Sequence, residues 1–190
     1  MRQKIDTTYI YVTHDQTEAM TLGDRIVIMK DGEVQQIGTP QQVFNHPYNL
    51  FVAGFIGSPQ MNFFDAKLVK ADGKYAVEIG GQTVVLSDEK QAKLAANNVA
   101  AQAITLGVRP EHISLADAGV PANIDVSEMM GSSVHLHVNA NGKDVVIVVS
   151  TMNMTGAEVA ALSMGAAVNF AFGGNVCHVF NKETGINLEA

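Results

Sequence analysis

Hydrophobic and polar positions follow two different patterns along the chain, and the change falls near residue 57. Before it, a short apolar run at residues 9–13 leads into apolar positions with helical spacing, which predicts a buried strand followed at once by a helix. After it, short runs separated by Gly, Asn and Asp predict many strands. We therefore expect an α/β part, residues 1–57, followed by an all-β part, residues 58–190.

The predicted first helix has clear end signals. Asp15 can cap it, Glu18 can reach back to the cap, and Gly23 ends the apolar pattern. His14 therefore lies in the turn between strand and helix. In an open α/β sheet, ligands bind at the carboxyl ends of strands, and a histidine there can donate to a phosphate oxygen or carry a proton near neutral pH. His14 is the candidate functional residue, and the alternative is a surface histidine in a capped turn.

Three further elements complete the α/β part, and one of them is a short helix over residues 40–45 that Thr39 can cap. Residues 25–30 and 33–37 alternate around Asp31-Gly32, a dipeptide that strongly favours a two-stranded hairpin. Residues 49–56 form an apolar stretch that ends in a Gly-Ser-Pro break, which predicts a short helix. The break marks the predicted boundary between the two parts.

The all-β part is expected to contain many short strands and one helix. The predicted strands are residues 62–69, 75–79, 82–86, 103–109, 122–130, 132–140, 143–150, 167–172 and 175–180. Only residues 88–97 have a helical pattern. Short strands at regular turn spacing are typical of a barrel or sandwich. Residues 145–149, Val-Val-Ile-Val-Val, are apolar throughout, so a neighbouring sheet or a partner is expected to cover the second face of that strand.

Composition and charge exclude several classes of protein. The formal net charge of -7 and only 12 Lys and Arg residues argue against nucleic-acid binding, which requires clustered positive charge. No apolar run approaches the length of a membrane span, and residues 1–6 are too polar for a secretory signal. The single Cys177 excludes an internal disulfide and fits a reducing compartment. We expect a cytoplasmic globular protein.

Two histidine arrangements are candidates for chemical sites. His135 and His137 fall on one face of a predicted strand, a spacing that suits a metal, but no cysteine or third acidic ligand is evident near them. A solvated strand face is the preferred interpretation, and no metal site is expected. Cys177 and His178 are adjacent in the last strand, where neighbouring side chains point to opposite faces, so a nucleophile and base pair is not expected.

The residues around His14 carry a resemblance to a known family. The segments VTHDQTEAMTLGDRIVIMKDGEVQQIGTP, VFNHPYNLFVAGFIGSPQMNFF and LGVRPEHI resemble the ATP-binding subunits of ABC transporters, in the carbohydrate-importing branch that includes the maltose and multiple-sugar subunits. The likeness runs from about residue 7 to about residue 185. It implies that residues 1–57 are the truncated α/β end of a P-loop nucleotide-binding domain. It also implies that residues 58–190 are a transport-associated regulatory domain with an oligonucleotide/oligosaccharide-binding (OB) type of fold.

The resemblance also implies which parts of the nucleotide site the chain contains. In the family, the histidine that matches His14 contacts the γ-phosphate of ATP and helps arrange the attacking water. The P-loop motif G-x-x-x-x-G-K-[ST] is absent, because the Gly-Lys pairs at residues 73–74 and 142–143 are followed by Tyr and Asp. Residues 79–82, Ile-Gly-Gly-Gln, resemble the LSGGQ signature but lack its serine and are better explained as a hairpin turn.

Two functions follow as expectations. The first is the C-terminal, regulatory portion of a sugar-importer ATPase, which in the intact subunit uses ATP and Mg²⁺ and lies on the inner face of the cell membrane. Its expected partners are transmembrane permease subunits, a second copy bound through the β-rich part, and a regulatory protein. By itself the chain is expected to be inactive and to hold no cofactor. The alternative is a stand-alone OB-like module that binds a small ligand. Arg109 and Glu111, in the motif LGVRPEHI, are expected to form a structural ion pair, and the alternative is that they contact a ligand.

Overall fold

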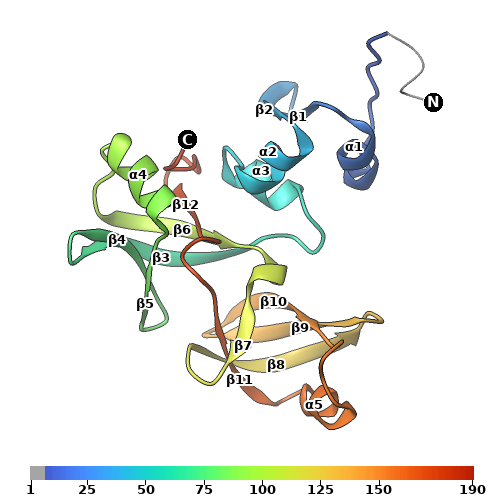
Figure 1. Cartoon of the computed structure of the whole chain (residues 1–190), viewed down its shortest axis with the longest axis vertical. Helices are drawn as coiled ribbons and strands as arrows, with labels where there is room; N and C mark the ends of the chain where they lie inside the picture. Colours follow the sequence, from blue (N-terminus) through green and yellow to red (C-terminus); the bar gives the residue numbers. More distant parts are fainter. Residues whose placement is uncertain (1–6) are drawn as a thin grey trace.

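The computed structural model describes residues 7–190 and shows a helical part beside two β-sheets (Figure 1). The helical part contains α1 (Gln16–Leu22), β1 (Ile26–Lys30), β2 (Glu33–Gly38), α2 (Pro40–Asn45) and α3 (Leu50–Phe55). Residues 1–6, whose polar character argued against a secretory signal, lie outside the described residues. No helix within residues 7–190 combines the length and apolarity needed to cross a bilayer.

The prediction of a buried strand at residues 9–13 is wrong. These residues form no strand, and Ile10 and Val12 are about nine-tenths exposed. A strand needs a partner for its backbone groups, and residues 9–13 pair with no described strand.

The predicted helix after Asp15 is confirmed, with one correction. The Asp15 carboxylate accepts from the backbone amides of Thr17 and Glu18, and α1 ends at Gly23. The prediction that Glu18 reaches back to the amide of Asp15 is wrong. Its carboxylate instead accepts hydrogen bonds from Thr13 Oγ1 at 2.8 Å and Tyr11 Oη at 3.1 Å.

The predicted hairpin is confirmed, and it has two unlike faces. Asp31 and Gly32 both take positive φ, as a type I′ turn requires. On one face, Ile26 and Ile28 pack with Val43 of α2 and with Val52 and Ile56 of the α3 region. On the other face lie two cross-strand pairs, Val27 with Ile37 and Met29 with Val34, whose side chains are all about half exposed.

The first five-stranded sheet has the order β12-β6-β3-β4-β5 and is antiparallel in every described pairing. It consists of β3 (Asn62–Ala71), β4 (Lys74–Ile79), β5 (Gln82–Val85), β6 (Gln102–Val108) and β12 (His178–Asn181), with α4 (Asp88–Ala96) beside it. Gly80 and Gly81 form the turn between β4 and β5 with positive φ, which confirms the hairpin expected at Ile-Gly-Gly-Gln.

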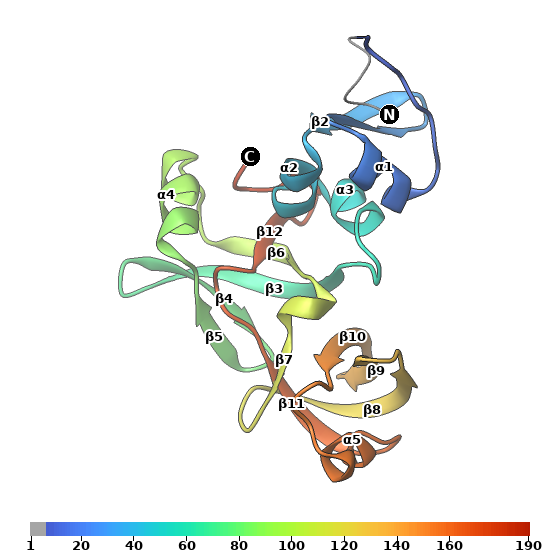
Figure 2. The same cartoon turned by 45° about the vertical axis from the view of Figure 1, so that its right-hand side comes forward.

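The second five-stranded sheet has the order β10-β9-β8-β11-β7. It consists of β7 (Ser114–Ala116), β8 (Val120–Met129), β9 (Ser133–Ala140), β10 (Lys143–Ser150) and β11 (Ala167–Ala171), with η2 (Pro110–His112) before β7 and α5 (Gly156–Ala161) after β10. One hydrophobic cluster joins the sheets, since it contains Leu68 and Ile104 from the first and Leu136 and Ile147 from the second. Figure 2 shows this second sheet below the first, away from the helical part.

Nearly all of the predicted strands of the all-β part are present, with three differences. Strand β7 was not predicted, α5 was not predicted, and the last strand begins at His178 instead of residue 175. The α5 helix has a capping box, in which Thr155 and Glu158 bond each other's backbone amides, so the Thr-x-x-Glu signal was present in the sequence and was missed. Along β10, Val145 and Ile147 are buried while Val146 and Val148 are only half-buried.

The free edge of β10 is held by a side chain of the other sheet. Asn62, at the start of β3, donates from Nδ2 to the carbonyl of Val146 and accepts from the amide of Val146, both at 2.8 Å. Asn62 is only 7% exposed, and its side-chain amide satisfies both backbone hydrogen-bonding groups of Val146.

Candidate functional site

His14 lies in an exposed bend directly ahead of the Asp15 cap of α1, as predicted, but the strand that was predicted to precede this turn is absent. Two positions later, Gln16 connects this turn to the linker that leads into the β part. The amide of Gly57 donates to Oε1 of Gln16 at 2.7 Å. The turn that carries His14 is thus tied to a residue 41 positions away from Gln16 in the chain.

Arg109, at the end of β6, binds the residue next to Gly57. Its Nη1 donates to the carbonyl of Ile56 and its Nη2 to the carbonyl of Phe44, each at 2.7 Å. The guanidinium also lies over the Phe44 ring. Arg109 is 1% exposed, and burial lowers its pKa to about 10, which leaves it charged at neutral pH.

The predicted ion pair between Arg109 and Glu111 is wrong, although the structural role of Arg109 is confirmed. Both terminal nitrogens of Arg109 are occupied by backbone carbonyls of the helical part. Glu111 is exposed and acts on Arg109 only through its charge, which raises the arginine pKa and partly offsets burial. The two residues that Arg109 does bind lie 53 and 65 positions away, so no local pattern could have identified them.

Gly57 is required where Arg109 and the linker meet. It adopts φ +111°, a conformation that side chains disfavour. A Cβ atom there would lie 2.5 Å from Nη1 of Arg109. The approach of the guanidinium to Ile56 therefore depends on the missing side chain at position 57.

A segment near the end of the chain makes a second connection between the helical part and the β part. The amide of Asn187 donates to the carbonyl of Tyr48 at 2.8 Å, and Nδ2 of Asn187 donates to the carbonyl of Pro47 at 2.9 Å. The amide of Leu50 donates to the carbonyl of Gly185 at 2.9 Å. Figure 1 shows this C-terminal segment between α4 and the helical part.

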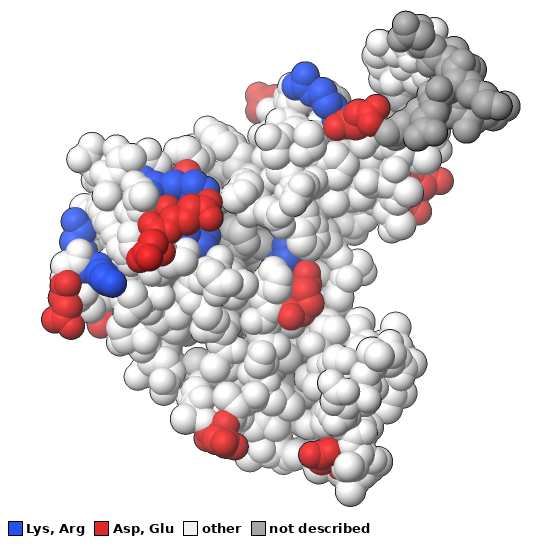
Figure 3. Space-filling view, in the orientation of Figure 1, with Lys and Arg blue, Asp and Glu red and all other residues white. Residues whose placement is uncertain are grey.

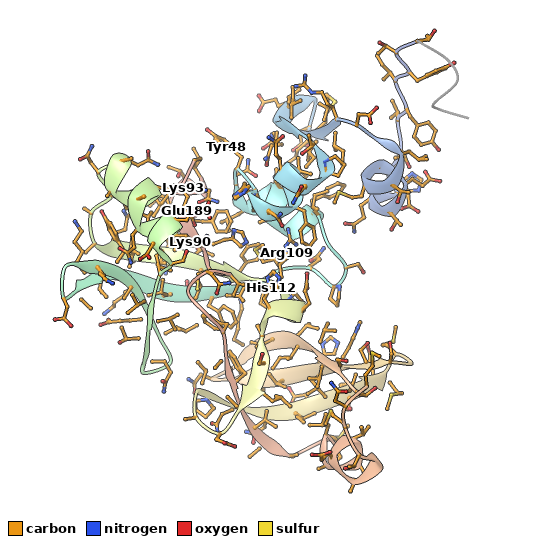
Figure 4. The ribbon with its side chains drawn as sticks, in the orientation of Figure 1. Tyr48, Lys90, Lys93, Arg109, His112 and Glu189 are labelled. Atoms are coloured by element: carbon orange, nitrogen blue, oxygen red, sulfur yellow. The ribbon has the colours of Figure 1, made fainter. Side chains whose placement is uncertain are left out.

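These two parts enclose a groove of about 510 Å³, called here the tail groove. It is lined by residues 35–37 and 46–48 of the helical part, and by Lys93, His178, Asn187, Glu189 and Ala190 of the β part. Figure 4 shows Tyr48, on the loop after α2, above Lys93 and Glu189.

The charges beside the tail groove are arranged in pairs. Lys90 donates from Nζ to both carboxylate oxygens of Glu189 at 2.9 Å, and the side chains of this pair are 10% and 6% exposed. Lys93 forms an ion pair with Glu89 at 2.7 Å. In the space-filling view, blue and red side chains gather together over α4 (Figure 3). Both lysines near the groove are therefore neutralised by a carboxylate.

His178 lines the tail groove with its imidazole uncharged. The residue is 7% exposed, and burial, together with the positive charges of Lys90 and Arg109, lowers its pKa to about 3. No hydrogen bond joins the ring to any residue in the described part of the chain, and its ring contact is with Phe180 at a centroid distance of 6.4 Å. Sequence reasoning did not single out this histidine as a binding residue, because its surroundings come from distant segments.

Cys177, next to His178, is not activated as a nucleophile. It is fully buried, its Sγ lies 3.5 Å from the carbonyl of Gly173, and burial raises its pKa to about 12. A thiol with that pKa stays protonated at neutral pH, so the adjacent imidazole does not generate a thiolate.

His135 and His137 lie on the outer face of β9, as predicted. The structure brings two carboxylates near His137 that the sequence did not reveal, Asp144 at 3.6 Å and Glu128 at 3.9 Å. These distances exceed those of hydrogen bonds. Among residues 7–190, no group of three His, Cys, Asp or Glu side chains is placed to hold a metal ion.

Two family models match the β part. Residues 57–113 match the MalK OB fold domain, and residues 106–180 match the TOBE domain. The expectation of an OB-type, all-β domain is thereby confirmed.

Curated relatives align with nearly the whole chain. The oligosaccharides import ATP-binding protein MsmX of Bacillus subtilis is 36% identical over 196 residues, which cover 99% of this chain and 51% of MsmX. The sn-glycerol-3-phosphate import ATP-binding protein UgpC of a Ruegeria species is 42% identical over 186 residues, 97% of this chain and 48% of UgpC. The uncharacterized ABC transporter ATP-binding protein YcjV of Escherichia coli is 41% identical over 192 residues, 99% of this chain and 50% of YcjV. The chain thus spans about half the length of these relatives.

Proposed function

We propose that this chain is the C-terminal, regulatory portion of an ATP-binding subunit of a sugar-importing ABC transporter, because its β part matches the MalK OB fold and TOBE domains and nearly all of the chain aligns with such subunits. In the intact subunit, ATP hydrolysis with Mg²⁺ drives carbohydrate uptake through transmembrane permease subunits. The subunit then works at the inner face of the cell membrane without crossing it.

The proposal gives His14 the role of contacting the γ-phosphate of ATP and orienting the attacking water. The exposed position of His14 in the turn before α1 supports this role, because the side chain is accessible to a nucleotide held by other elements. Phosphoryl transfer depends on positioning and on stabilising charge in the transition state, which one histidine can assist but not supply alone. The P-loop motif is absent from the sequence, so we expect the chain by itself not to hydrolyse ATP.

The observation that carries the proposal is that the linker at residues 56–57 forms hydrogen bonds with both parts of the chain. Gly57 donates to Gln16, two positions from His14, while the neighbouring Ile56 accepts from Arg109 of the β part. A movement of the His14 turn on nucleotide binding therefore reaches the β part through two short hydrogen bonds at adjacent residues. This contiguous path is the kind of connection through which a regulatory domain can sense a nucleotide site.

The outer face of the hairpin supports the assignment of the helical part. Its two apolar cross-strand pairs are about half exposed, and such a face is normally covered. We assign its cover to the remainder of the nucleotide-binding domain. The side chains of Val146 and Val148 on β10, which are only half-buried, in turn support self-association through the β part. A regulatory protein is a further proposed partner of this part.

Isothermal titration with Mg-ATP tests the proposal. The chain is compared with a longer polypeptide in which the P-loop-containing sequence of a relative is joined ahead of it. We expect only the longer polypeptide to bind and hydrolyse ATP. Clear ATP binding by the chain itself would overturn the proposal.

The role of His14 is tested in the longer polypeptide. His14→Ala is expected to lower kcat by about 100-fold or more while the Kd for ATP stays nearly unchanged, since the lost contact acts mainly in the transition state. His112→Ala, which changes an exposed histidine of the β part, is the matched control and should leave kcat unaltered. Equal kcat values for the His14 variant and the control would remove His14 from the mechanism.

A further inference from the structure

The imidazole of His178 is a nearly buried polar group without a hydrogen-bond partner among the described residues, and it lines the tail groove. Among the described residues, the only fully buried side-chain nitrogen or oxygen without a partner is Nε of Arg109, so the unpartnered ring nitrogens of His178 keep access to solvent. A neutral imidazole offers one donor and one acceptor. The imidazole of His178 therefore offers a ligand in the groove one hydrogen-bond donor and one acceptor.

Other polar groups along the groove are also available. No described residue forms a hydrogen bond with the side chain of Tyr48, whose residue is 45% exposed and offers both a ring face and a hydroxyl. Gln35 accepts from Nδ2 of Asn49 at 3.0 Å through its Oε1, which leaves its amide NH₂ free to donate. His46 contributes a second, exposed imidazole. These groups both donate and accept.

The pairing of charges decides which ligand fits. Lys90 and Lys93 are each neutralised by a carboxylate, so neither offers an unpaired positive charge to an anion. The carboxylate of Glu189, which lines the groove, is paired in the same way, so the lining has no unpaired lysine or glutamate charge to select an ionic ligand. A neutral molecule with many hydroxyl groups matches the lining, because each hydroxyl can donate to one group and accept from another while its C–H face packs on an aromatic ring.

We propose that the tail groove binds a neutral polyhydroxylated molecule of mono- or disaccharide size, with His178 and Tyr48 as its principal contacts. The groove volume of about 510 Å³ lies within the range of small-molecule sites. One wall comes from the helical part and the other from the β part, so an occupied groove holds the two parts together. The site would let an internal sugar modulate the connection between them.

The test measures binding by the whole chain in the absence of nucleotide, so its result does not depend on the proposed ATPase role. Glucose and maltose serve as neutral probes, and glucose 6-phosphate and inorganic phosphate as anionic ones. We expect saturable binding of at least one neutral probe, seen by calorimetry and by a shift of the His178 ring proton signals in NMR spectra. His178→Leu should weaken this binding about tenfold or more, and Tyr48→Phe about threefold or more.

His135→Leu, which changes a half-buried histidine on the outer face of β9, is the matched control and should bind as the unaltered chain does. The proposal is overturned if neither neutral probe saturates the chain, if only the anionic probes bind, or if the affinity is the same in both groove variants. Tyr48→Phe removes only one exposed hydroxyl, so it gives a decisive result even if His178→Leu does not fold.

Discussion

The guanidinium carbon of Arg109 lies 3.7 Å from the centre of the Phe44 ring, and the same guanidinium donates to the carbonyl of Phe44. One arginine of the β part thus holds a helix residue of the helical part through both its ring and its backbone. Contact of a cation with an aromatic face and charge-assisted hydrogen bonds are each stronger when water is excluded. At 1% exposure, Arg109 meets that condition.

Arg109→Met should lower the free energy of unfolding by about 2–4 kcal/mol, because the carbonyls of Ile56 and Phe44 lose their partner in a buried place. Urea unfolding measures the change. Lys67→Met alters an exposed residue on β3 and should shift stability by no more than about 0.5 kcal/mol. Similar stabilities for the two variants would show that the Arg109 contacts contribute little.

Gly57→Ala and Gly73→Ala separate steric clash from backbone strain. Both glycines have positive φ, so backbone strain in each alanine variant should lower the free energy of unfolding by about 1 kcal/mol. Only at position 57 would the new Cβ also collide with Arg109, whereas nothing lies within 4 Å of a Cβ at position 73. We expect Gly57→Ala to be the more destabilising in thermal unfolding, by at least about 1 kcal/mol. Equal losses would mean that Arg109 moves aside freely.

Asn62→Ala should free the edge of β10 at Val146. Two hydrogen bonds of 2.8 Å are lost, so the Val146 amide is expected to exchange with solvent about tenfold faster or more in hydrogen exchange measured by NMR. Asn123→Ala, on an exposed position of β8, is the control and should leave that amide protected. An unchanged exchange rate in the Asn62 variant would indicate that another group covers the edge.

Stability should fall as the pH drops below the ordinary histidine pKa of 6.5, because of His178. Burial lowers the pKa of His178 to about 3 in the folded chain, so between these values the unfolded chain binds a proton that the folded chain does not. The free energy of unfolding then decreases with falling pH, by up to about 1.4 kcal/mol per pH unit for this one group.

Urea unfolding at several pH values between 7 and 5, above the range of ordinary carboxyl groups, measures this dependence. In His178→Leu the free energy of unfolding should change less per pH unit, by an amount that corresponds to at most one proton bound on unfolding. If both proteins show the same slope, the imidazole of His178 is accessible to protons in the folded chain.

Features governed by neighbouring residues were predictable from the sequence. Asp31-Gly32 specifies its turn, and Asp15 caps α1, because both effects act within a few positions. The strand expected at residues 9–13 failed for the opposite reason: an apolar run reports that a segment suits burial but does not supply the partner strand.

The groove and the linker contacts were not predictable in the same way. The side chain of Asn187 meets Pro47 across 140 positions, and Arg109 meets Phe44 across 65. Their residue types carry no local signal for such partners. His14 was placed in its turn by local pattern, but its proposed role came from resemblance, since a turn histidine alone does not specify a ligand.

The contact between Asn187 and Pro47 also has a consequence for the order in which the protein is made. A chain emerges from the ribosome starting at its N-terminus, so the loop at Pro47 and Tyr48 is synthesised well before the residues that donate hydrogen bonds to it. The carbonyls of Pro47 and Tyr48 therefore remain hydrated until both sheets have been translated and Asn187 has been added. The final docking of the helical part is thus a late event of biosynthesis, and interruption of translation between the two segments would release a helical part without this second attachment.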